Sequence, residues 1–214
     1  FKQKTAYEIS LGLVGSEMCI RDRLKGATSS KTRATTERVR SAIFNILDPD
    51  RYEGGRVLDL FAGTGSLGIE ALSHGARSAD FVEWDRRQSE VISSNLTSTG
   101  FASQGHVHCM DVMQALIALP GNYDLVLLDP PYGMSGLDDL IEKISSKSRL
   151  IVDGGVVVVG HSKHRALNEK FGFLNLTSHR QYGDNVVDFF VCAQNPTEEL
   201  IQSTDIGEDR YKSW

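Results

Sequence analysis

The sequence has no apolar run long enough to span a bilayer, and it has little cysteine. A membrane-spanning helix needs about 20 largely apolar residues, so we expect no membrane partner. Of the three cysteines, Cys109 and Cys192 lie in strand-like segments and Cys19 lies near the start of the chain. Their odd number and their spacing fit neither a metal site nor a disulfide framework. We therefore expect buried thiols in a reducing compartment, either the bacterial cytoplasm or a eukaryotic organelle, and no metal.

Basic residues are also scarce: 23 lysines and arginines face 28 acidic residues, which gives a net charge of −5. The charges are unevenly distributed. Residues 24–40 hold five basic residues and one acidic residue, whereas residues 195–214 hold two basic and five acidic residues. Because phosphate contacts are made mainly by lysine and arginine, residues 24–40 are the part expected to face a nucleic acid, and the acidic tail is expected to be disordered.

Residues 1–23, FKQKTAYEISLGLVGSEMCIRDR, differ in character from the rest of the chain. They resemble the translation of a sequencing-adaptor read-through, and we expect them to be foreign to the protein. Glu8 and two glycines interrupt the apolar stretch, which argues against a signal peptide. The native N-terminus, with any targeting peptide, is then expected to be missing. Residues 24–194 are long enough for one domain with a single core, and we expect a monomer.

Strand-like and helix-like segments alternate through the chain, which predicts an α/β fold with a doubly wound, mostly parallel sheet that ends in an antiparallel hairpin. Ligands bind at the carboxyl ends of such strands. The first helix has one apolar stripe and is expected to cover the cofactor site. The expected helices are 36–47, 66–73, 86–98, 112–118, 136–147 and 163–170. The expected strands are 56–60, 79–83, 106–109, 123–128, 155–160, about 173–180 and 186–192.

The segment RVLDLFAGTGSLG, residues 56–68, is typical of an apolar strand followed by a glycine-rich turn and the start of a helix. Glycines allow positive φ and a close approach of ligand to backbone, and a helix N-terminus offers free N–H groups. Gly63, Gly65 and Gly68 also satisfy G-x-G-x-x-G, and Glu83 follows at the distance of a ribose-binding acid. A nicotinamide dinucleotide is therefore one alternative ligand.

The acidic residues at the predicted strand ends favour S-adenosylmethionine instead. Asp59 lies inside the strand, where it would accept from the ammonium of a methionine moiety and repel a pyrophosphate. Glu83 ends the next strand and is placed to accept from both ribose hydroxyls, with Trp84 or Asp85 beside the adenine. Asp111 would accept from the adenine amino group. Each acid has a structural alternative as a helix N-cap, and only for Asp85 is that alternative preferred.

Asp129-Pro130-Pro131-Tyr132 follows the apolar run YDLVLL at residues 123–128. Two prolines fix φ near −65° and remove backbone N–H groups, so the turn presents only hydrogen-bond acceptors. Asp129 and the Pro130 carbonyl would accept both protons of a planar NH₂ group while Tyr132 stacks on its ring, which directs the nitrogen lone pair outward. The alternative is a turn that ends the strand and whose aspartate caps the next helix.

Four segments give the chain a resemblance to the RsmD family of ribosomal RNA guanine-N2 methyltransferases. They are TRATTERVRSAIFNIL (32–47), DLFAGTGSLGIEAL (59–72), FVEWDRR (81–87) and LVLLDPPY (125–132). The resemblance extends from about residue 33 to residue 193. It implies a Rossmann-like class I methyltransferase fold, S-adenosylmethionine as cofactor, and ribosomal RNA or the small ribosomal subunit as partner.

The resemblance also implies roles for individual residues. The base would be held by Asp129, Pro130, Pro131 and Tyr132. RNA contacts are expected from the basic segment, at Arg33, Thr35, Arg38 and Arg40, although Arg38 and Arg40 fit a solvated helix face equally well. The expected cofactor-binding residues are Asp59, Phe61, Ala62, Gly63, Gly65, Glu83, Trp84, Asp111 and Val112.

The chain departs from the family pattern in three places. Ala34 stands where proline is usual, and Gly160 stands where glutamate is common. A basic glycine-rich hairpin precedes the first helix in the family, and here only Leu24-Lys25-Gly26 is left of it, which predicts a weaker grip on RNA. Two other functions stay open: methylation of an adenine or protein amide, and a non-enzymatic nucleotide-binding domain.

Overall fold

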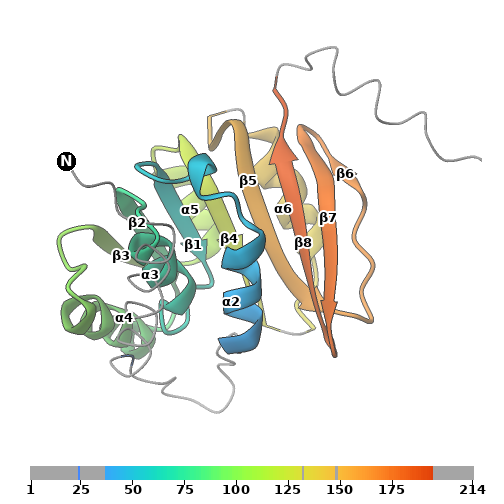
Figure 1. Ribbon diagram of the computed structural model, residues 1–214. Coiled ribbons are helices and arrows are strands. Elements are labelled where there is room, and N and C mark those ends of the chain that lie inside the picture. Colours follow the sequence, from blue (N-terminus) through green and yellow to red (C-terminus); the bar gives the residue numbers. More distant parts are fainter. Residues whose placement is uncertain (1–23, 25–36, 132, 148, 195–214) are drawn as a thin grey trace, which may run out of the picture.

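A computed structural model describes residue 24 and residues 37–131, 133–147 and 149–194 (Figure 1). Its sheet has the strand order β3-β2-β1-β4-β5-β8-β7-β6, in which β1 to β5 run parallel and the remaining pairings are antiparallel. The strands are β1 Arg56–Leu60, β2 Ser78–Glu83, β3 Gly105–Cys109, β4 Tyr123–Leu128, β5 Ile151–Ser162, β6 Lys170–Phe171, β7 Leu174–Tyr182 and β8 Asn185–Cys192. The helices are α2 Glu37–Ile46, α3 Ser66–Ser73, α4 Arg86–Thr99, α5 Val112–Ala118 and α6 Leu137–Ser146, with a 3₁₀ turn η1 at Pro49–Arg51.

Helices cover both faces of the sheet, and the central strands are therefore apolar on both sides. In β4, Leu125 and Leu127 join the core formed with α2, α3 and α4. Their neighbours Val126 and Leu128 join the core formed with α5 and α6. Successive strand residues point to opposite faces, so one uninterrupted apolar run serves two cores. This arrangement confirms the predicted doubly wound, mostly parallel sheet that ends in an antiparallel hairpin (Figure 1).

The helix predicted at residues 163–170 does not form. The chain instead turns after β5, runs without regular structure, and pairs Lys170 and Phe171 with β7. The segment carries no apolar stripe that a helix could bury: among residues 163–170 the hydrophobic core contacts only Leu167. Its charged side chains bind other parts of the fold, as Arg165 does with Asp138. Tertiary contacts therefore replace the local helix.

Helix α2 packs its apolar stripe onto the sheet face that also carries α3 and α4 (Figure 1). Val39, Ile43 and Phe44 are buried, and the helix ends before Asp48 and Pro49, as predicted. The Asp48 carboxylate accepts from the Asp50 N–H and caps η1. The helix lies beside the carboxyl ends of β4 and β5, where the predicted site is located.

The expected limits of the domain, at residues 23 and 195, lie outside the described residues and stay predictions. Among the residues that the structure describes, no helix combines the length and apolar character needed to cross a membrane.

Candidate active site

The sheet order brings the predicted cofactor turn and the predicted base-binding turn to one edge. Strand β1 is the direct neighbour of both β2 and β4, with Asp59 opposite Phe81 and Leu127. All three strands run parallel, so Glu83, at the end of β2, and Asp129, after β4, lie on the same side as Asp59. The carboxylates of Asp129 and Glu83 are both close enough to Asp59 to raise its pKa. The three acids therefore cluster at one edge of the sheet.

The turn after β1 is shaped by backbone conformations that few residues adopt. Gly63 and Gly65 have φ of 56° and 77°, as predicted, and Phe61 also has a positive φ of 64°. Non-glycine residues rarely take this conformation, and it is concentrated at functional sites. Two backbone–backbone hydrogen bonds help to hold the turn: the Ala62 N–H donates to the Val82 carbonyl, and the Gly65 N–H donates to the Ala62 carbonyl.

Gly68 lets helix α3 lie directly against the sheet. A Cβ at this position would lie 2.3 Å from Cε1 of Phe81, which is far inside van der Waals contact. The Gly68 N–H donates a 2.9 Å hydrogen bond to Oδ2 of Asp59. The third glycine of the G-x-G-x-x-G pattern therefore serves helix packing and fixes a site carboxylate.

Asp59 is a buried acid with an unusual proton affinity. Its side chain is almost fully buried, and this desolvation raises the pKa of Asp59 to about 7 against the opposing effect of the Gly68 N–H. The nearby Asp129 and Glu83 raise the pKa of Asp59 further. A cation placed beside these three carboxylates would favour their charged forms. The site therefore suits an ammonium or sulfonium group and disfavours a pyrophosphate.

Glu83 joins the end of β2 to the glycine turn. Its Oε2 accepts from the Gly63 N–H and its Oε1 from the Asp85 N–H, both at 3.0 Å. A carboxylate oxygen has two lone pairs, so each oxygen retains the capacity to accept from one ribose hydroxyl. The side chain is buried, which fixes its orientation. Its predicted ribose contact stays a prediction that this geometry supports.

Two other acids cap helices. Asp85 accepts from the Arg87 and Gln88 N–H groups at the start of α4, which confirms the preferred interpretation of this residue. Asp111 accepts from the Met113 N–H and forms a capping box with Gln114 at the start of α5. Its expected contact with adenine is untested.

The remaining two predicted cofactor residues differ in exposure. Trp84 follows Glu83 and is 77% exposed, so its ring is accessible to a flat ligand. Val112 begins α5 and is 8% exposed.

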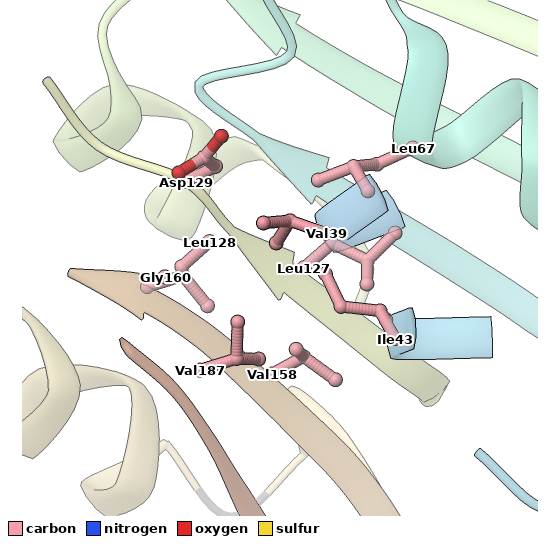
Figure 2. Close-up of a pocket in the computed structure, with 9 residues that line it drawn as sticks. All are labelled: Val39, Ile43, Leu67, Leu127, Leu128, Asp129, Val158, Gly160 and Val187. Carbon is pink, nitrogen blue, oxygen red and sulfur yellow. The ribbon is translucent and has the colours of Figure 1, made fainter. Parts of the chain in front are cut away.

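Asp129 lies at one side of a small, mostly apolar pocket beneath α2. Figure 2 shows the apolar side chains that converge there, with the carboxylate beside them. A Cβ at residue 160 would lie 2.7 Å from Oδ1 of Asp129, so the glycine found there makes room for the carboxylate against β5. The lining residues are Val39, Ile43, Leu67, Leu127, Leu128, Asp129, Val158, Gly160 and Val187.

The Asp-Pro-Pro turn continues into a tight loop. The Met134 N–H donates to the Pro131 carbonyl at 3.1 Å, and Gly133 between them has a φ of 81°. Pro130 and Pro131 provide no N–H, so the part of the turn that the structure describes offers acceptors only. Tyr132 lies outside the described residues, and its predicted stacking is untested.

The predicted RNA contacts are only partly visible. Arg38 is exposed near the start of α2, one residue before Val39 of the pocket. Arg40 instead points inward, where its Nε lies 3.2 Å from Oε2 of Glu70 and its side chain is 12% exposed. Its solvated-face alternative is therefore wrong, and its predicted RNA contact is untested. Arg33 and Thr35 lie outside the described residues.

One supporting residue was not predicted. Asn95 of α4 is fully buried, and its Nδ2 donates to the Thr64 carbonyl at 2.9 Å. This hydrogen bond connects the glycine turn to α4. A buried polar residue on a helix gives no sequence signal of what it will contact.

Comparisons with known proteins agree with this geometry. The family model described as "Conserved hypothetical protein 95" matches residues 16–191. The Bacillus subtilis protein named "Putative rRNA methyltransferase YlbH" is 36% identical over 163 residues, which cover 75% of this chain and 88% of that protein. The Escherichia coli "Ribosomal RNA small subunit methyltransferase D" is 36% identical over 118 residues, which cover 55% of this chain and 59% of that enzyme.

Among solved structures, a conserved hypothetical protein from Streptococcus pyogenes superposes with a TM-score of 0.67 at 36% identity. The superposition covers 72% of this chain and 94% of that one. The matched family model spans most of the chain and includes the residues of the sheet edge described above. The chain therefore belongs to the RsmD family of RNA methyltransferases.

Proposed function

We propose that the protein transfers a methyl group from S-adenosylmethionine to the exocyclic N2 amine of a guanine in small-subunit ribosomal RNA. The observation that carries this proposal is the shared sheet edge: the acceptor turn at Asp129 adjoins the glycine turn and the acid cluster around Asp59. Relatives named as ribosomal RNA methyltransferases, one of them for the small subunit, support the choice of substrate.

In the proposed complex, the described residues bind both reactants. S-adenosylmethionine supplies, when bound, a methyl group on a positively charged sulfur. Asp59 and Glu83 provide buried negative charge and hydrogen-bond acceptors for a cationic nucleoside, and the glycine turn lets it approach the backbone. Asp129 and the Pro130 carbonyl accept the two amine protons, which orients the nitrogen lone pair toward the neighbouring turn.

Proton balance gives Asp129 a second role. The amine nitrogen gains a bond to carbon and must then lose one proton. The Asp129 carboxylate accepts from this nitrogen in the proposed complex, so it is placed to take that proton or pass it to water. Orientation of the two reactants contributes more than proton transfer, because the reacting methyl group already carries its own leaving group.

Guanine fits an acceptor-only turn better than adenine does. Its Watson–Crick edge places the N1–H donor directly beside the N2 amine, so a carboxylate can accept from both groups. Adenine places an acceptor nitrogen beside its N6 amine, and two acceptors would then face one another. The flipped or unpaired base is expected to bring its amine to Asp129 at the carboxyl end of β4.

Labelled methyl transfer tests the proposal. The purified chain is given labelled S-adenosylmethionine with free small-subunit rRNA, with assembling small subunits, and with DNA. We expect incorporation into one or both ribosomal substrates and none into DNA. Incorporation into DNA or protein alone would support the alternative amine methyltransferase. Calorimetry with S-adenosylmethionine and with NAD is the control: binding of NAD in preference would support a dinucleotide-binding domain.

A further inference from the structure

Arg165 binds the loop that continues from the Asp-Pro-Pro turn. Its Nη2 donates to the Met134 carbonyl at 2.7 Å, and its Nη1 donates to Oδ2 of Asp138 at 3.0 Å. Met134 lies in this loop, and Asp138 lies in the first turn of α6. A guanidinium presents its donors in a rigid planar fork, so one side chain can satisfy both acceptors.

The loop needs such support because two of its residues are glycines with positive φ. Gly133 and Gly136 have φ of 81° and 78°, and glycine is the residue with the greatest conformational freedom. Met134 lies between them, and its N–H already closes the turn on the Pro131 carbonyl. Holding the Met134 carbonyl as well fixes this residue through both of its peptide groups. The constraint is thereby passed to Pro131, two residues from Asp129.

Arg165 is itself anchored in the fold. Its N–H donates to the Ser162 carbonyl, which closes a turn directly after β5. In the same turn, the Lys163 N–H donates to the Asp184 carbonyl at 3.0 Å, and its Nζ lies 2.7 Å from Oδ1 of Asp184. Asp184 is at the tip of the β7–β8 hairpin. A continuous set of contacts thus runs from this hairpin through Arg165 to the loop.

We propose that Arg165 is a positioning residue: it holds the loop after Asp129-Pro130-Pro131 in the conformation that accepts the target base. This inference rests on the proposed methyl transfer. Arg165 lies on the β5 side of Asp129, whereas the cofactor residues lie on β1 and β2. Loss of Arg165 therefore lowers the fraction of molecules with a competent loop and leaves the cofactor site intact.

The main test compares Arg165→Gln with Asp138→Asn and Arg149→Gln. Arg149 is an exposed arginine beside Gly121, at the opposite end of the strands, so its variant matches the charge loss alone. We expect Arg165→Gln to lower kcat for RNA methylation about tenfold or more, with the affinity for S-adenosylmethionine changed less than about twofold. Asp138→Asn keeps the bond to the Met134 carbonyl and should lose less than about threefold. Arg149→Gln should match the wild type.

Three kinetic results would overturn the inference. One is wild-type kcat in Arg165→Gln. Another is an equal loss in Asp138→Asn, which would assign the effect to the ion pair with α6. The third is an increase in KM for RNA alone, accompanied by a weaker salt dependence, which would make Arg165 a phosphate contact.

Hydrogen exchange gives a readout that does not depend on activity. In Arg165→Gln, exchange of the Met134 amide and its neighbours in the loop should accelerate, while exchange in β4 and α6 stays unchanged. Unchanged loop exchange would refute the positioning role even if activity fell. Faster loop exchange in a protein whose wild type methylates no RNA would instead refute the proposed function and leave the role of Arg165 standing.

Discussion

Three carboxylates at the sheet edge have different environments. Asp59 is buried and accepts from the Gly68 N–H near the start of α3. Glu83 accepts from two backbone N–H groups, and Asp129 lies beside an apolar pocket. Acids that share a site but differ in surroundings commonly take different roles. We assign Asp59 and Glu83 to the cofactor and Asp129 to the target base.

Replacing Asp129 by alanine tests this division of roles. The variant loses the acceptor for the amine proton and the orientation of the base, so methyl transfer should fall at least about a thousandfold. Affinity for S-adenosylmethionine should stay within a few fold, because Asp129 is assigned to the base. The two quantities are measured by labelled methyl transfer and by calorimetry. Retained activity would remove Asp129 from the mechanism, and loss of cofactor binding would place it in the other site.

Asp59 predicts a pH dependence of cofactor binding. Burial raises the pKa of Asp59 to about 7, and a cationic ligand binds the deprotonated form. Lowering the pH from 7 to 6 reduces that form from about one half to about one tenth, so affinity should fall about fivefold. Equilibrium dialysis with labelled S-adenosylmethionine at constant ionic strength measures the change. Asp59→Asn should bind more weakly and show a flat profile, and a flat wild-type profile would contradict the assignment.

The raised pKa of Asp59 also determines how the stability of the ligand-free protein changes with pH. The folded protein keeps a proton on Asp59 that the unfolded chain releases above its ordinary pKa of 3.8. This residue therefore lowers the free energy of unfolding as the pH rises from about 4 to about 7. The behaviour is opposite to that of an aspartate in a salt bridge, because burial without a cationic partner favours the protonated form.

Residues whose roles depend on their immediate chain neighbours were predictable. The caps at Asp85 and the positive φ of Gly63 and Gly65 follow from local rules. The roles of Asn95 and Arg165 were not, because each is defined by an acceptor that lies about 30 residues away in sequence and is adjacent only after folding.

At the scale of single elements, strands were predicted better than the segments between them. Buried parallel strands are largely apolar on both faces, so β4 stands out by its run Leu125–Leu128, and β1 and β2 stand out by apolar residues around one buried aspartate each. The helix expected at residues 163–170 was wrong, since local propensity was overridden by the contacts of Lys163 and Arg165. One of these contacts involves Arg165, for which we propose a positioning role.

Helix α2 carries two arginines whose replacement should have different effects. Arg40 forms a largely buried ion pair with Glu70, so Arg40→Met should lower the free energy of unfolding by about 2 kcal/mol. Arg38 is exposed beside the pocket, so Arg38→Met should leave stability unchanged and weaken RNA binding severalfold. Denaturant unfolding and RNA titration distinguish them. Equal effects of both changes on stability would refute the inward role of Arg40.

At the scale of the whole molecule, strand order turns separate motifs into one site. The glycine turn and the Asp-Pro-Pro turn are more than 60 residues apart in the sequence, and neither motif specifies the other's position. Placing β1 between β2 and β4 puts both turns at one sheet edge. The alternation of strands and helices predicted such an edge, while the apolar pocket under α2 required the packed structure.

The identity of the methylated nucleoside tests the proposed chemistry most directly. Small-subunit rRNA is methylated with labelled S-adenosylmethionine, digested to nucleosides and separated. The arrangement of acceptors around Asp129 predicts label in N2-methylguanosine, and no label when Asp129 is replaced by alanine. Label in N6-methyladenosine, or equal labelling by the Asp129 variant, would contradict it.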